Sequence, residues 1–140
     1  MSNLSNVFKI IRDVIPNKKK YSILEFDVMM KEMYSRDGEP MYSLIKNYIS
    51  ENNTGYTTDI NIFNNVIDKI YDVMDFVVVI NDEDLFLRSN SFKDKDEFLG
   101  ESFIQIIIND GELIDIICQD KYLESKLKSN FSSFPFWIND

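Results

Sequence analysis

The feature that most constrains the fold is a pair of apolar runs in the second half of the chain. Phe76–Ile80 contains five apolar residues, four of them β-branched, and Phe103–Ile108 is interrupted only by Gln105. β-Branched side chains favour extended backbone, and strands without a clear apolar–polar alternation are usually covered on both faces. The two runs therefore predict buried strands in a sheet that needs cover on each side.

Both runs lead into Ile-Asn-Asp, and both are followed by acidic and aliphatic residues. Asn and Asp, together with Gly111, tolerate the positive φ values of tight hairpin turns. We therefore predict one hairpin that joins residues 76–80 to 85–88 and a second that joins 103–108 to 112–118. Short connections favour a simple four-stranded antiparallel meander.

Before Asp75 the apolar residues recur at the three-and-four spacing of a helical face. Ser22 and Glu25 also have the spacing of a capping box, and Thr57 or Thr58 can cap a further helix. Asp120 can begin a short helix after the sheet. The helices predicted from these signals cover residues 3–15, 22–34, 41–49, 58–74 and 121–128.

Together these segments predict a single α+β domain over residues 1–140. Residues 1–74 are expected to be mainly helical, and residues 75–119 to form the antiparallel sheet. Residues 120–140 are expected to form a helix and an aromatic tail. In this arrangement the N-terminal helices cover one face of the sheet, and the C-terminal helix and tail, or another chain, cover the other.

The charge of the chain is unevenly distributed. The net charge is −9, with about +2 in residues 1–50 and −11 in residues 51–140. An acidic surface repels the phosphate backbone of nucleic acids and attracts basic proteins. We therefore expect a basic protein partner and no nucleic acid.

The chain contains no histidine. This excludes Ser-His and Cys-His nucleophile systems, imidazole metal sites and the usual proton shuttle at neutral pH. The glycines do not form a phosphate-binding loop, and the acids at Asp94 and Asp96 do not fit a calcium-binding EF-hand because Gly100 comes one position late. The sequence therefore predicts a protein that is not an enzyme and holds no cofactor or metal.

In a meander the two predicted turns lie at the same end of the sheet, roughly 10 Å apart. Carboxylates of both turns would then converge on one rim and attract a basic partner, although turns also take such residues for backbone reasons alone. The tail adds apolar side chains that suit an interface anchor. The predicted partner-binding residues are Asp82, Glu83, Asp84, Asp110, Glu112, Phe136 and Trp137.

Residue Cys118 is the only cysteine, so the chain has no internal disulfide. The first residues lack the basic start, long apolar centre and cleavage site of a secretory signal. No apolar run approaches the length that spans a bilayer. We therefore expect a cytoplasmic protein that does not bind membranes.

Three functional hypotheses follow from these observations. The first is a cytoplasmic inhibitor or immunity-type protein that masks a basic partner such as a nuclease toxin. The second is a homo-oligomeric scaffold or adaptor, in which the open sheet face and the tail pair with a second copy. The third is an enzyme that uses carboxylates and a divalent metal.

Overall fold

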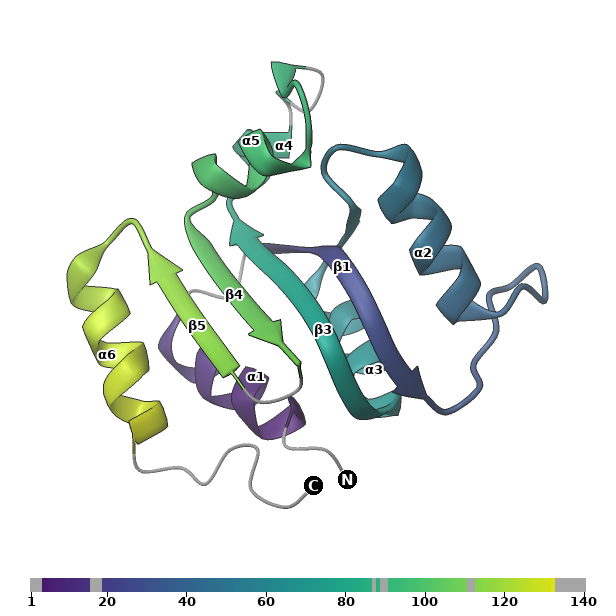
Figure 1. The fold of residues 1–140 in the computed structure, drawn as a ribbon, viewed down its shortest axis with the longest axis horizontal. Coiled ribbons are helices and arrows are strands. Elements are labelled where there is room, and N and C mark those ends of the chain that lie inside the picture. Colours follow the sequence, from purple (N-terminus) through teal and green to yellow (C-terminus); the bar gives the residue numbers. More distant parts are fainter. Residues whose placement is uncertain (1–3, 16–18, 87, 89–90, 111–112, 133–140) are drawn as a thin grey trace.

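The computed structural model of the protein describes residues 4–15, 19–86, 88, 91–110 and 113–132. Within these residues, helices and strands interleave along the chain (Figure 1). The helices are α1 (Leu4–Val14), α2 (Met41–Glu51), α3 (Ile60–Lys69), α4 (Glu83–Phe86), α5 (Lys95–Glu101) and α6 (Lys121–Ser132). The strands are β1 (Lys20–Met30), β2 (Tyr56–Thr58), β3 (Ile70–Asn81), β4 (Ile104–Asn109) and β5 (Leu113–Cys118).

The five strands form one antiparallel sheet in the order β2-β1-β3-β4-β5. The predicted α+β class and the antiparallel sheet are confirmed. The predicted segregation, with helices first and a four-stranded meander after them, is wrong. The central pair of strands, β1 and β3, joins residues from the two parts of the chain that were expected to fold as different kinds of structure.

The helix predicted over residues 22–34 is wrong, because most of this segment forms β1. The buried side chains of Ile23 and Phe26 both belong to the main core. A register shift between Ile23 and Glu25 places one extra residue in β1. A regular strand returns to the same face every second residue, so a bulge produces a spacing of three that imitates a helical turn.

The same effect shortens the helix predicted to reach Met74. Helix α3 ends at Lys69, and β3 begins at the next residue. Ile70, Val73 and Phe76 are all buried in the main core although they are three residues apart. Two further register shifts between β1 and β3 each skip one residue of β3, which accounts for this spacing.

The strand predicted at residues 85–88 is also wrong, and with it the predicted strand order. The chain leaves β3 at Asn81 and enters the short helix α4, not a hairpin. Asp94 caps the next helix, α5, by accepting a hydrogen bond from the N–H of Glu97. The chain then returns as β4, whose Ile104 pairs with Ile80 of β3.

Several local predictions are confirmed. α1 and α2 lie where the apolar spacing placed them, and α6 begins after Asp120 as predicted. Residues 109–110 lead into a hairpin between β4 and β5. Asp110 adopts a φ of 55°, the left-handed conformation expected there. The cap of α3 is a small correction, because Asp59, not a threonine, accepts a hydrogen bond from the N–H of Ile62.

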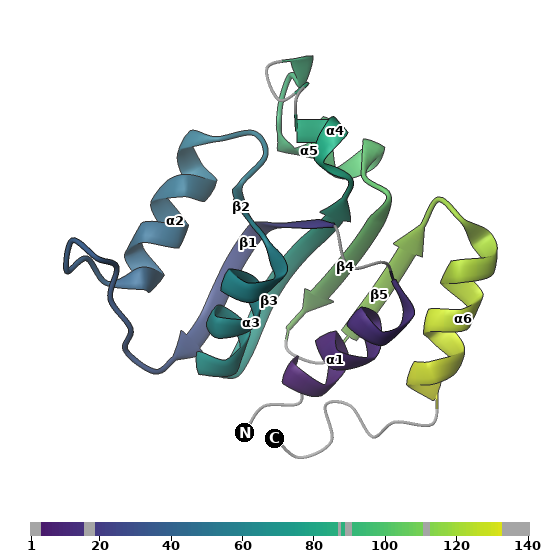
Figure 2. The same ribbon diagram turned by 180° about the vertical axis from the view of Figure 1, so that it is seen from behind.

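The main core lies between the sheet and helices α1 and α3, which cover the face turned toward the viewer in Figure 2. We call this the covered face. Phe8 of α1 makes edge contacts with the rings of Phe63 and Phe76. Leu127 of α6 belongs to the same core, so α6 does not cover the opposite face as predicted. Helix α6 extends to Ser132, beyond the predicted end at residue 128, and the rest of the predicted tail, residues 133–140, lies outside the described residues.

The opposite sheet face carries a second, smaller core at one end. Leu24, Val77 and Val79 pack there against Phe92 and Phe98, whose rings are 5.2 Å apart. Figure 1 shows α4 and α5 together at this end of the sheet. This cap leaves the other half of the face without a covering helix among the described residues, and we call that half the open face.

Candidate functional site

The structure separates the acids that were predicted to converge. Asp82 and Asp84 follow the last residues of β3, whereas Asp110 follows the end of β4. Because β4 runs antiparallel to β3, Asp110 lies beside Asp75, and its N–H donates a hydrogen bond to the Asp75 carboxylate at 3.2 Å. Seven strand residues separate these ends by roughly 20 Å. The prediction of one acidic rim is therefore wrong.

The other predicted partner-binding residues are placed as follows. Glu83 is exposed and lies on α4, at the same end as Asp82. Glu112, Phe136 and Trp137 lie outside the described residues. The structure therefore brings Asp82, Glu83 and Asp84 together, through sequence proximity alone, and sets Asp110 apart.

At the end where β3 leaves the sheet, charges of both signs lie close together. The Lys19 ammonium pairs with the Asp82 carboxylate at 2.6 Å and lies 5.0 Å from the centre of the Phe103 ring. A cleft of about 700 Å³ opens beside this pair, with Arg88 and Glu101 also in its lining. Because the lining contains both cations and carboxylates, the cleft has no single charge that would select a basic partner.

A buried hydrogen-bond network holds the cap onto the sheet at the same end. The Asn81 amide donates to the Ser102 hydroxyl at 3.0 Å, and its carbonyl oxygen accepts the N–H of Phe103 at 2.7 Å. The Ser102 hydroxyl donates in turn to the carbonyl oxygen of Phe98 at 2.7 Å. Asn81 is therefore a structural residue that ties α5 to β3 and β4.

The open face carries a different set of acids, contributed by three strands. Asp27 of β1 lies directly opposite Asp75 of β3. One row along the sheet, Glu25 lies opposite Val77, and farther along the same row Ile107 of β4 lies opposite Asp115 of β5. Paired residues in an antiparallel ladder point to the same face. Carboxylates therefore lie at both ends of a row whose centre, Val77 and Ile107, packs against the second core beneath the cap.

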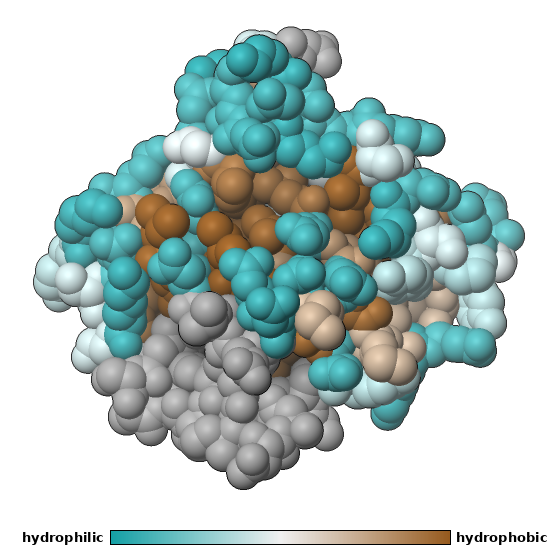
Figure 3. Space-filling view, in the orientation of Figure 1, coloured by the Kyte–Doolittle hydropathy of each residue, from teal (hydrophilic) through white to brown (hydrophobic). Residues whose placement is uncertain are grey.

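Exposed apolar side chains lie among these acids. Met29 is 55% exposed and lies two residues from Asp27 on the same side of β1. Ile117 is 37% exposed and lies opposite Gln105, which pairs with Val79 at the capped end of the same sheet face. Figure 3 shows the result, with brown apolar surface below the hydrophilic cap and hydrophilic side chains within it. Apolar surface of this kind, bordered by charge, is typical of protein-binding sites.

Within the described part of the chain, no ion pair involves Asp27, Asp75 or Asp115, the acids of the open face. Partial burial raises the pKa of the Glu25 carboxyl, and the negative charges of Asp75 and Asp27 raise it further, while the Lys46 ammonium opposes them. The open face therefore keeps a concentration of negative charge that a cation would relieve.

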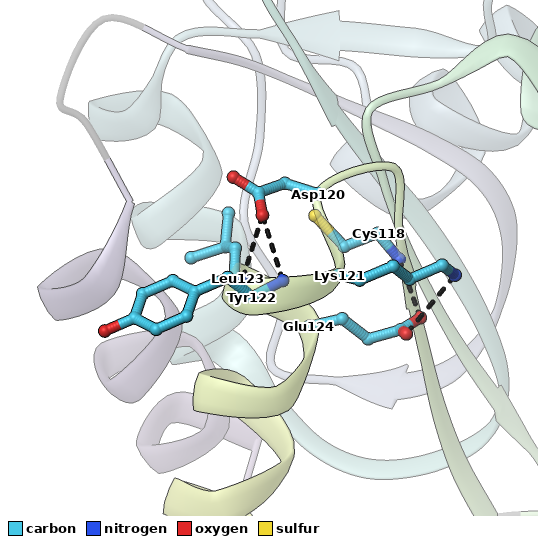
Figure 4. A network of polar contacts seen from close by, with 6 residues as sticks. All are labelled: Cys118, Asp120, Lys121, Tyr122, Leu123 and Glu124. Atoms are coloured by element: carbon cyan, nitrogen blue, oxygen red, sulfur yellow. Dashed lines mark hydrogen bonds and ion pairs between the residues drawn. The ribbon is translucent and has the colours of Figure 1, made fainter.

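The other acids near β5 have structural roles (Figure 4). Asp120 begins α6 by accepting hydrogen bonds from the N–H groups of Tyr122 and Leu123. Glu124 accepts the N–H of Cys118 at 3.1 Å, and this bond lowers the pKa of the Glu124 carboxyl. Glu124 therefore has a structural role, since its carboxylate links α6 to the edge strand β5.

Among the described residues, no group of three or more His, Cys, Asp or Glu side chains could hold a metal ion. None of the described helices has the length and apolar character needed to cross a membrane.

Sequence reasoning missed Glu25 and Asp27 of the open face because they come from a segment predicted to be helical. The signal was present in β1, where Glu25, Asp27 and Met29 alternate with buried residues. This two-residue alternation marks a strand with one exposed face. Comparisons with known proteins add no assignment, since no protein-family model, no curated protein and no solved structure matches this chain.

Proposed function

We propose that the protein is a non-enzymatic binding protein that takes a basic protein partner on its open face. Its role in the cell is that of an inhibitor or immunity-type protein, which masks the cationic surface of a partner such as a nuclease toxin. One observation carries the proposal. Carboxylates that form no ion pair among the described residues lie beside exposed apolar side chains on the side of the sheet opposite α1 and α3.

Charged and apolar side chains on such a surface contribute to binding in different ways, and both contributions support this proposal. Negative charge steers a basic partner toward the face and accelerates association, particularly at low salt. Apolar contacts at the centre exclude water and slow dissociation. In this proposal Met29 and Ile117 supply the apolar contacts, and Asp27, Asp75 and Asp115 supply the charge.

Charge also disfavours pairing of the open face with a second copy. Two such faces would bring the same carboxylates together, and like charges in contact cost free energy. The scaffold hypothesis therefore receives less support from this surface than the basic partner does.

The test is affinity capture with matched baits followed by titration of the captured protein. Asp115→Lys reverses one exposed charge on the open face, and Asp84→Lys makes the same change near the mixed-charge cleft. A basic partner should lose at least about tenfold in affinity for Asp115→Lys and little for Asp84→Lys. Thermal unfolding of both variants controls for folding.

The opposite pattern of affinities would reject the open face as the binding site. If a basic protein binds Asp115→Lys as tightly as wild type but loses affinity for Asp84→Lys, the residues at the end of β3 bind the partner. If no basic protein is captured at low salt, and sedimentation shows a salt-resistant dimer, the scaffold hypothesis replaces the proposed function.

A further inference from the structure

A pocket of about 280 Å³ lies at the β2 edge of the sheet, where α2 leads through a short loop into β2 (Figure 2). We call it the tyrosine pocket. None of its lining side chains is charged at neutral pH, although the net charge of the chain is −9. A ligand there would not be held by ion pairs, which disfavours phosphates, carboxylates and ammonium ions. The lining residues are Tyr48, Asn52, Thr54, Gly55, Tyr56 and Thr57.

Two tyrosine rings form one side of the tyrosine pocket. The ring centres of Tyr48 on α2 and Tyr56 on β2 are 5.5 Å apart, and the ring planes are inclined by 64°. Tyr48 is 49% exposed, so part of its side chain is accessible to a ligand. Among the described residues, no group forms a hydrogen bond with either tyrosine hydroxyl. Both hydroxyls can therefore donate to a ligand and accept from it.

The polar side of the pocket is a loop held close to the sheet. The Asn52 amide nitrogen donates to the Tyr48 carbonyl oxygen at 3.0 Å, which leaves the Asn52 amide oxygen as an acceptor. Gly55 adopts a φ of 65°, and a Cβ at this position would collide with the carbonyl oxygen of Ile23. The Thr54 hydroxyl has no hydrogen-bond partner in the described part of the chain. The loop thus presents neutral donors and acceptors beside the two rings.

From these observations we infer that the tyrosine pocket binds a neutral saccharide. A sugar ring has C–H groups on its faces and hydroxyls around its rim. The C–H face suits the aromatic ring of Tyr48, and the hydroxyls suit the amide of Asn52 and the hydroxyl of Thr54. The pocket is slightly smaller than the usual range for drug-sized ligands, about 300–1,000 Å³, so it suits one or two sugar rings. The inference is independent of the proposed function, because the pocket shares no residue with the open face.

Titration of the full chain with neutral sugars, followed by NMR of the backbone amides, tests the inference. The probes are glucose, galactose, mannose and N-acetylglucosamine. At least one of them should shift the amide signals of Gly55 and Thr57 to saturation. We expect a Kd of about 1–10 mM, because the site leaves Tyr48 half exposed and buries little of the ligand.

Variants separate the tyrosine pocket from other exposed tyrosines. Tyr48→Ala removes the ring that packs on the sugar and should weaken binding at least about tenfold. Tyr48→Phe keeps the ring and should weaken binding less. The matched control is Tyr122→Ala, which removes a 79% exposed tyrosine from α6 and should leave the Kd unchanged. Thermal unfolding of all three variants controls for folding.

The absence of a saturable shift with every sugar at about 100 mM would overturn the inference. A Kd that Tyr48→Ala leaves unchanged would overturn it as well. Binding of benzamide, a neutral aromatic compound, in place of any sugar would show that the pocket accepts flat rings and not saccharides.

A trisaccharide of the sugar that binds distinguishes two sources of the ligand. If it binds at least about tenfold more tightly than the single sugar, the inference is supported with a glycan chain as the ligand. If both bind equally, the inference is supported with a free sugar as the ligand.

Discussion

The two faces of the sheet show how one set of strands can serve stability on one side and binding on the other. On the covered face, Phe26, Phe76 and Val78 are almost fully buried beneath α1 and α3. On the open face, the same strands present Glu25, Asp27 and Asp75. Like charges placed directly opposite each other destabilise a sheet. The difference indicates that the open face is not optimised for the stability of the isolated chain.

The largest effect should come from the covered face. Phe76 is fully buried and contacts the rings of Phe8 and Phe26, so Phe76→Ala should reduce the free energy of unfolding by about 3–5 kcal/mol. Met29→Ala, on the open face, should change it by less than about 0.5 kcal/mol. Urea unfolding followed by circular dichroism measures both. Similar losses in the two variants would mean that the open face is packed in solution.

An intermediate effect is expected where the cap joins the sheet. Asn81→Ala removes the hydrogen bond that Asn81 donates to the Ser102 hydroxyl and the one that it accepts from the Phe103 N–H. The free energy of unfolding should fall by about 1–3 kcal/mol. Hydrogen exchange of the Phe103 amide should become faster in this variant. The matched control is Asn52→Ala. It removes an exposed hydrogen bond from the Asn52 side-chain amide to the Tyr48 carbonyl oxygen, and should lower the free energy of unfolding by less than about 0.5 kcal/mol. Equal losses of unfolding free energy in the two variants would show that the buried Asn81 hydrogen bonds stabilise the fold no more than an exposed one does.

The smallest effect is the pH dependence that arises from the open face. The pKa of Glu25 is raised in the folded chain above its ordinary value of 4.5, so the folded state binds more protons than the unfolded state between these two values. The free energy of unfolding should therefore fall as pH rises through this window. The contribution of Glu25 to the free energy of unfolding should be fully present at pH values below 4.5.

Glu25→Gln should flatten this part of the pH profile, as measured by urea unfolding at a series of pH values. Added salt should flatten it as well, because salt screens the repulsion from Asp27 and Asp75. An unchanged slope in Glu25→Gln would show that other groups produce the pH dependence.

Local sequence signals predicted the elements whose boundaries depend on nearby residues. The apolar spacing of residues 41–49 placed α2, and Asp120 marked the start of α6. The turn at Asn109–Asp110 identified the hairpin of β4 and β5. Caps and turns act within four residues, so a short window of sequence contains the whole interaction.

The bulged strands could not be identified in this way. Ile23 and Phe26, and likewise Ile70, Val73 and Phe76, have the spacing of a helix although they belong to strands. A bulge exists only in relation to the strand paired with it, and β1 and β3 are separated in sequence by two helices and β2. The strand preference of a segment depends strongly on such pairing and burial.

The sequence by itself determined the α+β class, the antiparallel hairpin, several helices and the acidity of the second part of the chain. Tertiary structure alone decided the strand order, the strand identity of residues 20–30 and which acids share a surface. It separated Asp82 from Asp110 and placed Asp27 opposite Asp75. The physical reason is that local conformation follows from neighbouring residues, whereas the composition of a sheet face follows from register between segments distant in the chain.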